Sequence, residues 1–212
     1  MKKGIAVVVV GGTAGGGITR LLSGTNATVV RPPGAGEEND FLAKCIRCAK
    51  CVQACPYDSI KTAGLGDGAS MGTPFLELRE IPCYMCEDLP CVGVCPTDAL
   101  DPTLTDAAKM LLGTAVIVDR EACLSLNGIR CEICYRVCPL IDKAIVIEKH
   151  AHQITGRHTV FEPVVQKEVC TGCGICENAC PLDDTAIAVV PTQRGDKAAH
   201  YDYLRKQERV EL

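Results

Sequence analysis

The sequence predicts an α+β protein made of small repeated units, and three observations lead to this. The chain has 212 residues and 16 cysteines, but no tryptophan and only 4% aromatic residues, so aromatic packing cannot be what holds it together. The cysteines recur in four groups, whose first members are spaced 38, 40 and 47 residues apart along the chain. Short apolar runs that suit β-strands lie before or after these groups. We therefore expect a fourfold degenerate repeat.

Each group contains four cysteines and ends in Cys-Pro, and no cysteine is left over. The first and fourth groups share the spacing C-x2-C-x2-C-x3-C-P, which is the signature of bacterial ferredoxins. The second group has a wider middle gap and the third a wider first gap, but both keep the C-x3-C-P ending. We name the groups motifs one to four, and their members are the expected metal ligands: Cys45, Cys48, Cys51, Cys55; Cys83, Cys86, Cys91, Cys95; Cys123, Cys131, Cys134, Cys138; Cys170, Cys173, Cys176, Cys180.

This pattern predicts four 4Fe-4S clusters, with every thiolate used once. Three closely spaced cysteines can curl a loop around one cluster, while the fourth ligates the neighbouring cluster in two-cluster ferredoxins and the proline ends the loop. Zinc sites pair C-x2-C units across a longer loop, disulfides join distant segments, and c-type haem needs C-x-x-C-H, so these alternatives fit less well. The expected fold is a tandem of two ferredoxin-like units, stabilised by the clusters.

The secondary structure follows from the apolar runs and the turn residues. Residues 64–73 are rich in glycine and predict a loop, and residues 106–112 predict a short helix capped by Thr105. His150, His152 and His158, in an expected loop before motif four, should be surface residues, as should His200. The expected strands lie before motifs two, three and four and after motifs three and four, at 75–78, 115–118, 160–165, 144–147 and 186–190.

The two ends of the chain differ from its middle, residues 31–191. Lys2 and Lys3 precede an apolar stretch, so residues 1–30 predict an export signal or an uncleaved anchor. That stretch of about fifteen residues falls short of the roughly 20 that a spanning helix needs, which excludes a polytopic transporter. A dinucleotide-binding turn is the alternative for residues 11–17, but neither G-x-G-x-x-G nor a βαβ unit follows.

Residues 192–212 predict a charged tail, either solvated or used for docking. The net charge of −4 gives no basic footprint for nucleic acid, so no nucleic-acid partner is expected.

Residues 31–61, 81–101, 123–139 and 170–181, with the unusual spacings of motifs two and three, resemble the MauM/NapG family of ferredoxin-type proteins, most of all its NapG members. The resemblance implies an electron-transfer component and not an enzyme. Its partners would be a NapH-like membrane protein that oxidises quinol and, downstream, a c-type cytochrome or periplasmic nitrate reductase. It also implies a periplasmic location, attached to the membrane face, after twin-arginine export, although this sequence shows Lys2-Lys3 instead of the family's two arginines.

The resemblance further implies that motif one pairs with motif four, and motif two with motif three. The fourth ligands would then be Cys180 for motif one, Cys55 for motif four, Cys138 for motif two and Cys95 for motif three. Two other functions stay open: an iron–sulfur subunit of another respiratory system, such as a molybdopterin enzyme, a hydrogenase or methylamine utilisation, and a protein whose clusters serve only structure or sensing.

The charges beside the cysteines predict a difference in reduction potential. Lys44, Arg47 and Lys50 lie in or next to motif one, whereas Glu87 and Asp88 lie in motif two. A nearby cation favours the reduced, more negative cluster. We therefore expect the cluster of motif one to have a higher potential than that of motif two.

Overall fold

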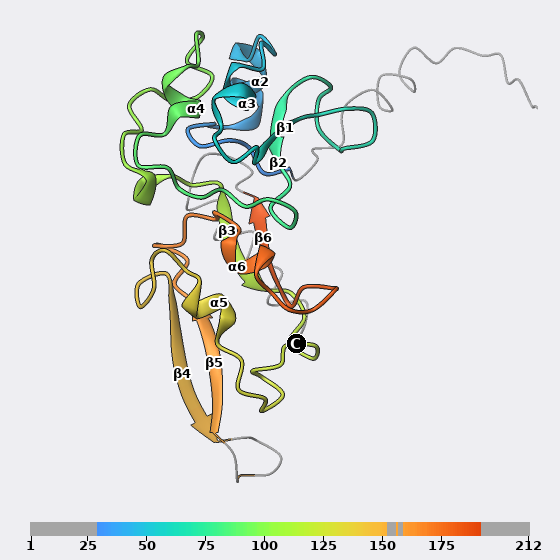
Figure 1. The fold of residues 1–212 in the computed structure, drawn as a ribbon, viewed down its shortest axis with the longest axis vertical. Helices are drawn as coiled ribbons and strands as arrows, with labels where there is room; N and C mark the ends of the chain where they lie inside the picture. The colour runs from blue at the N-terminus through green and yellow to red at the C-terminus, as the bar shows by residue number, and fades with distance from the viewer. Residues whose placement is uncertain (1–28, 152–155, 157–158, 192–212) are drawn as a thin grey trace, which may run out of the picture.

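The structure is a computed structural model that describes residues 29–151, 156 and 159–191. These residues form two units arranged along the long axis of the molecule, unit one (residues 29–112) and unit two (residues 113–191) (Figure 1). Nearly all of the expected export segment, the tail at 192–212 and three of the histidines (His152, His158 and His200) lie outside the described residues. None of the described helices has the length and apolar character needed to cross a membrane.

A helix of one or one and a half turns follows the second cysteine of every motif and contains the third. The fourth cysteine comes within two residues of the helix end, and the proline after it lacks the N–H that would continue a helix. Cys55, for example, caps its helix with extended backbone. The four helices are Lys50–Ala54 (α3), Pro90–Gly93 (α4), Ile133–Arg136 (α5) and Ile175–Asn178 (α6).

The strands of the described residues form three antiparallel pairs (Figure 1). Unit one contains β1 (Ile60–Thr62) with β2 (Pro74–Leu76). Unit two contains β3 (Gly113–Ile117) with β6 (Ile187–Pro191), and β4 (Ile145–Ala151) with β5 (Thr159–Val165). The expected strands are thus confirmed with shifted ends, while β1 was not predicted. β5 continues through Pro163, because a strand in a two-stranded sheet has a free edge where the missing N–H is tolerated.

Three local features differ from the prediction. A helix before motif one, α2 (Glu38–Lys44), was not expected. The helix predicted at 106–112 is a 3₁₀ turn, η1 (Ala107–Lys109), and its cap is Asp106, not Thr105, because the Asp106 carboxylate accepts the N–H of Ala108 at 2.9 Å. His150 lies in β4 instead of a loop, although it is exposed as expected.

Arg31 fastens the start of unit one to its sheet. Arg31 is only 8% exposed. It donates to both carboxylate oxygens of Glu38, at 2.9 and 2.5 Å, and to Thr73 Oγ1 at 2.9 Å and the Pro74 carbonyl at 2.8 Å. It also lies 5.0 Å from the centre of the Phe41 ring. One buried cation therefore connects α2 with the beginning of β2.

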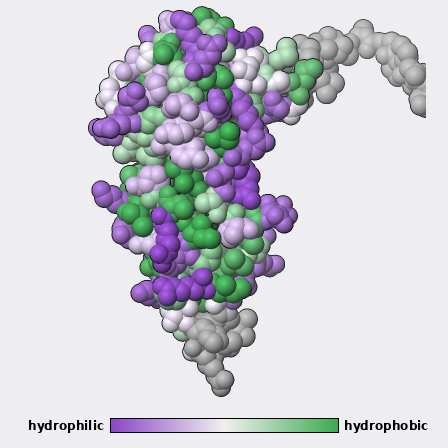
Figure 2. Space-filling view, in the orientation of Figure 1, coloured by the Kyte–Doolittle hydropathy of each residue, from purple (hydrophilic) through white to green (hydrophobic). Residues whose placement is uncertain are grey.

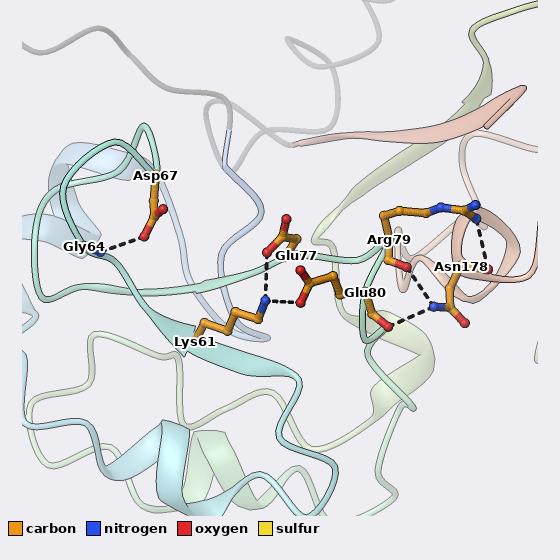
Figure 3. A network of polar contacts seen from close by, with 7 residues as sticks. All are labelled: Lys61, Gly64, Asp67, Glu77, Arg79, Glu80 and Asn178. Carbon is orange, nitrogen blue, oxygen red and sulfur yellow. Dashed lines mark hydrogen bonds and ion pairs between the residues drawn. The ribbon is translucent and has the colours of Figure 1, made fainter. Parts of the chain in front are cut away.

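The two units meet at a polar clamp (Figure 3). Asn178 of α6 donates to the carbonyls of Arg79 and Glu80 in unit one, at 2.9 and 3.0 Å. The Arg79 guanidinium in turn donates hydrogen bonds to the last carbonyls of α6 and to carbonyls of the residues just after it. The carbonyls at the end of a helix have no partner within the helix. These acceptors, at 2.8 to 3.1 Å, belong to Glu177, Asn178, Cys180 and Leu182. Figure 2 shows hydrophobic residues gathered near the middle of the visible face, around this junction.

Candidate functional site: four cysteine-lined cavities

The cysteines converge on four cavities, each lined by four thiols. Their empty volumes are similar, at about 350 to 390 Å³. All sixteen cysteines are free of disulfides. A 4Fe-4S cluster binds four thiolates, so the number and grouping of the thiols fit one cluster per cavity. We name the cavities site I (Cys45, Cys48, Cys51, Cys95), site II (Cys83, Cys86, Cys91, Cys55), site III (Cys123, Cys131, Cys134, Cys180) and site IV (Cys170, Cys173, Cys176, Cys138).

The fourth cysteine of each motif lies in the cavity of the adjacent motif. Cys55 and Cys95 are exchanged between motifs one and two, and Cys138 and Cys180 between motifs three and four. The expected pairing of motif one with four and of motif two with three is therefore wrong. The spacing inside a motif shapes the loop around its own cavity and does not decide which motif supplies the fourth thiol. The hairpin β1–β2 folds motif two back onto motif one, as short connections do with consecutive elements.

Each cavity is also closed by a proline and an aliphatic side chain, which the sequence reasoning missed. The proline is the one that follows the exchanged cysteine, and the aliphatic residue is 1 to 4% exposed. The signal was present, since an apolar residue follows the fourth cysteine by five positions in motifs one and two and by seven in motifs three and four. The pairs, for sites I to IV, are Pro96 and Leu100, Pro56 and Ile60, Pro181 and Ile187, and Pro139 and Ile145.

The cavities are apolar enough to disfavour free thiolates. Burial raises the pKa of Cys83, Cys91 and Cys134 to about 12, and that of Cys51 to about 11. Neighbouring thiolates add to the effect, as Cys45 does for Cys51. Such thiols are protonated at neutral pH unless a cation stabilises the thiolate. The donor set is therefore suited to a metal centre that supplies positive charge.

Backbone N–H groups stabilise sulfur at the same cavities. The N–H of Ala115 donates to Cys170 Sγ at 3.4 Å. For Cys95, burial raises the pKa, but hydrogen bonds from the backbone of Thr97, Leu100 and Ala99, together with the Thr97 hydroxyl, outweigh burial and lower it overall. Hydrogen bonds to the sulfurs are one of the protein's means of setting a cluster's potential.

The four sites lie in a continuous order, I, II, IV, III. Sites I and II exchange cysteines, and so do sites III and IV. Sites II and IV meet across the junction, where the N–H of Cys83 donates to the Cys173 carbonyl at 2.9 Å and Thr171 Oγ1 donates to Met85 Sδ at 3.7 Å. Sites I and III are therefore the two ends of the series. Of the sixteen cysteines, all within the described residues, only Cys48 of site I is exposed.

The comparisons with known proteins agree with this arrangement. A family described as "4Fe-4S dicluster domain" matches twice, at residues 44–99 and 129–183, so that each match joins adjacent motifs. The ferredoxin-type protein NapG of Escherichia coli is 46% identical over 189 residues, 88% of this chain and 82% of the relative. The methylamine utilization ferredoxin-type protein MauM of Methylorubrum extorquens is 46% identical over 193 residues, 91% of this chain and 86% of the relative. NapG of Haemophilus influenzae is 43% identical over 199 residues, 90% and 71% of the two chains.

Proposed function

Because the chain belongs to the MauM/NapG family of ferredoxin-type proteins and is an iron–sulfur electron carrier with four 4Fe-4S clusters, we propose that the four cysteine-lined cavities hold these clusters and form one wire. Each cluster supplies a one-electron couple when bound. The observation that carries the proposal is the continuous order of the sites, I, II, IV, III. Each site either exchanges a cysteine with the next one or contacts it across the junction between the two units. Sites I and III are then the ports for the two partners.

Residues around the cavities hold the sites in position and partly cover them. The Arg79 clamp fixes site IV against site II, because it holds the end of α6, which carries one cysteine of site IV. Tyr57 and Tyr84, with ring centres 4.5 Å apart, line site II. These residues position and cover the ligands, and we assign no substrate chemistry to the chain itself.

The proposed partners are a NapH-like membrane protein that oxidises quinol and, downstream, a c-type cytochrome or nitrate reductase in the periplasm. Two NapG relatives, at 46% and 43% identity, support this assignment. MauM of Methylorubrum extorquens is equally similar at 46%, and this favours a role in methylamine utilisation as the second candidate.

Deletion of the gene in its host tests both candidates. We expect quinol-driven nitrate reduction to be lost, while nitrate reduction driven by a reduced viologen dye is unchanged, because the dye delivers electrons directly to the reductase. Loss of methylamine oxidation with intact nitrate reduction would establish the second candidate instead. If neither activity changes, both assignments are wrong.

A further inference from the structure

Motifs one and four have loops of the same shape but different surroundings. In motif one, Arg47 and Ala49 adopt the left-handed conformation, with φ of 58° and 56°. Gly172 and Gly174 occupy the corresponding places in motif four, with φ of 71° and 80°. The shared cysteine spacing therefore produces one backbone turn, used twice. Only motif four uses glycine, the residue for which this conformation carries no steric cost.

The loop of motif four is an interface inside the molecule. A Cβ on Gly174 would lie 2.5 Å from Leu78 Cβ of unit one, and a Cβ on Gly172 would lie 2.4 Å from the backbone nitrogen of Gly113. Residues 170–174 are all buried. Through this contact the Cys173 carbonyl accepts the N–H of Cys83, and site IV lies against site II. The turn thus serves to bring a cluster site close to a redox neighbour.

The loop of motif one presents the same turn to solvent. Ile46 is 63% exposed, and Arg47 and Cys48 beside it are exposed as well. Met71, also 63% exposed, extends the apolar surface, because the neighbouring Gly72 lies against Arg47: a Cβ on Gly72 would be 3.2 Å from Arg47 Cδ. The exposed apolar surface therefore lies directly over site I.

The charge of this surface indicates what would cover it. Lys44 pairs with Asp40 at 2.8 Å. Arg47 and Lys50, by contrast, have no carboxylate partner among the described residues. These two unpaired cations lie next to a small apolar surface. A partner that carries carboxylates around an apolar patch of its own would complement it, since opposite potentials steer partners together and fix their orientation.

From the geometry of the turn and this charge, we infer that the loop of motif one, with Ile46, Arg47, Lys50 and Met71, is the docking surface for an acidic redox protein. That protein's cofactor exchanges single electrons with site I through the exposed Cys48 edge. The inference rests on the proposed wire and adds which end takes the acidic partner. The loop of motif four contacts unit one within the molecule, and the loop of motif one contacts a separate protein in the same way.

The test uses the full-length, iron-loaded protein, reduced anaerobically, with oxidised flavodoxin as an acidic probe and cytochrome c as a basic one. Each encounter moves one electron from the reduced clusters to the probe, and flavodoxin takes its proton from solvent. We expect the double variant Arg47→Glu/Lys50→Glu to slow the reaction with flavodoxin by about tenfold at low salt, because steering changes such rates by 10- to 1,000-fold. The reaction with cytochrome c should become faster.

Two further variants separate the contributions. Lys109→Glu/Lys143→Glu makes the same change in net charge at exposed positions outside the loop and should leave the flavodoxin rate near that of the wild type. Ile46→Ser should slow the reaction without altering its dependence on salt, since it removes apolar contact and no charge. Equal effects of both double variants would overturn the inference, because net charge alone would then explain them.

An unchanged flavodoxin rate in Arg47→Glu/Lys50→Glu would also overturn it. If that variant also lost the binding of the wild type to phosphatidylserine vesicles, the loop would be assigned to a membrane surface instead. Iron content and the spectrum of the reduced state are measured on every variant. Wild-type protein that cannot be reduced reversibly would refute the wire itself, whereas reducible protein with an insensitive rate refutes only the docking surface.

Discussion

Units one and two build the same pair of cavities on very different amounts of sheet. Unit two has strands of five and seven residues, in the pairs β3–β6 and β4–β5. Unit one has only the three-residue strands of β1–β2 and two isolated bridges, Val30 with Leu76 and Ala35 with Leu100. It adds instead the ion pair between the buried Arg31 and the half-buried Glu38. The feature common to both units is the exchange of fourth cysteines between adjacent motifs, whereas the length of the sheet differs between them. The exchange of cysteines, not the sheet, is therefore what makes each unit a unit.

The largest expected effect comes from removing iron by anaerobic chelation. Both units should lose their fold, because metal binding at such sites is folding free energy and the buried thiols then have no cationic partner. Unit two should keep more residual strand than unit one, which hydrogen exchange of β4 and β5 against β1 and β2 would detect. If the backbone amides of unit one kept their native protection from hydrogen exchange without iron, metal binding in the cavities would not be what stabilises its fold.

Exchanging the turn residues of motifs one and four is expected to have the next largest effect. Gly174→Ala should lower the free energy of unfolding by about 3 kcal/mol, because alanine pays for a left-handed φ and its methyl group displaces Leu78. Ala49→Gly should instead stabilise the protein slightly, because glycine carries no steric cost at the left-handed φ of 56° found there. Urea unfolding of the iron-loaded variants measures both changes. Similar changes at the two positions would refute the difference between a covered and an open loop.

The ion pairs of the two units should differ as well. Arg31→Ala should cost about 3 kcal/mol, because it leaves Glu38, Thr73 and a carbonyl without their buried donor. Arg120 of unit two, paired with Glu162 at 2.8 Å but 62% exposed, is the matched control, and Arg120→Ala should leave stability close to that of the wild type. The urea midpoint again serves as the measure, and a larger loss at Arg120 would contradict the role given to the buried Arg31.

The smallest effect is expected on reduction potentials. Arg47→Glu/Lys50→Glu should lower the potential of site I by tens of millivolts and that of site II by less, since negative charge disfavours the reduced cluster. A redox titration followed by electron paramagnetic resonance would resolve the two. An unshifted site I would show that solvent screens these exposed charges completely.

The sequence was most informative where local geometry decides. The Cys-Pro endings predicted the loops, and the β-branched runs predicted the strands of unit two, because both depend on neighbouring residues. The Asp106 cap was missed because several residues near the turn could serve as a cap.

The pairing of motifs failed because it depends on connections outside the cysteine groups. The resemblance to the family implied that motifs one and four pair, but their identical spacing has a different consequence. In the fold it produces one turn that meets unit one in motif four and solvent in motif one. The glycines at 172 and 174 carried that information, since only glycine permits such a close approach.

The exchange of fourth cysteines between adjacent motifs is tested most directly by iron content in two double variants. Cys48 and Cys95 both lie in site I, whereas Cys180 lies in site III. Cys48→Ala/Cys95→Ala should therefore lose one cluster and retain about twelve irons per chain, and Cys48→Ala/Cys180→Ala should lose two and retain about eight. The reverse result, eight irons in the first and twelve in the second, would show that motif one pairs with motif four and would contradict the account.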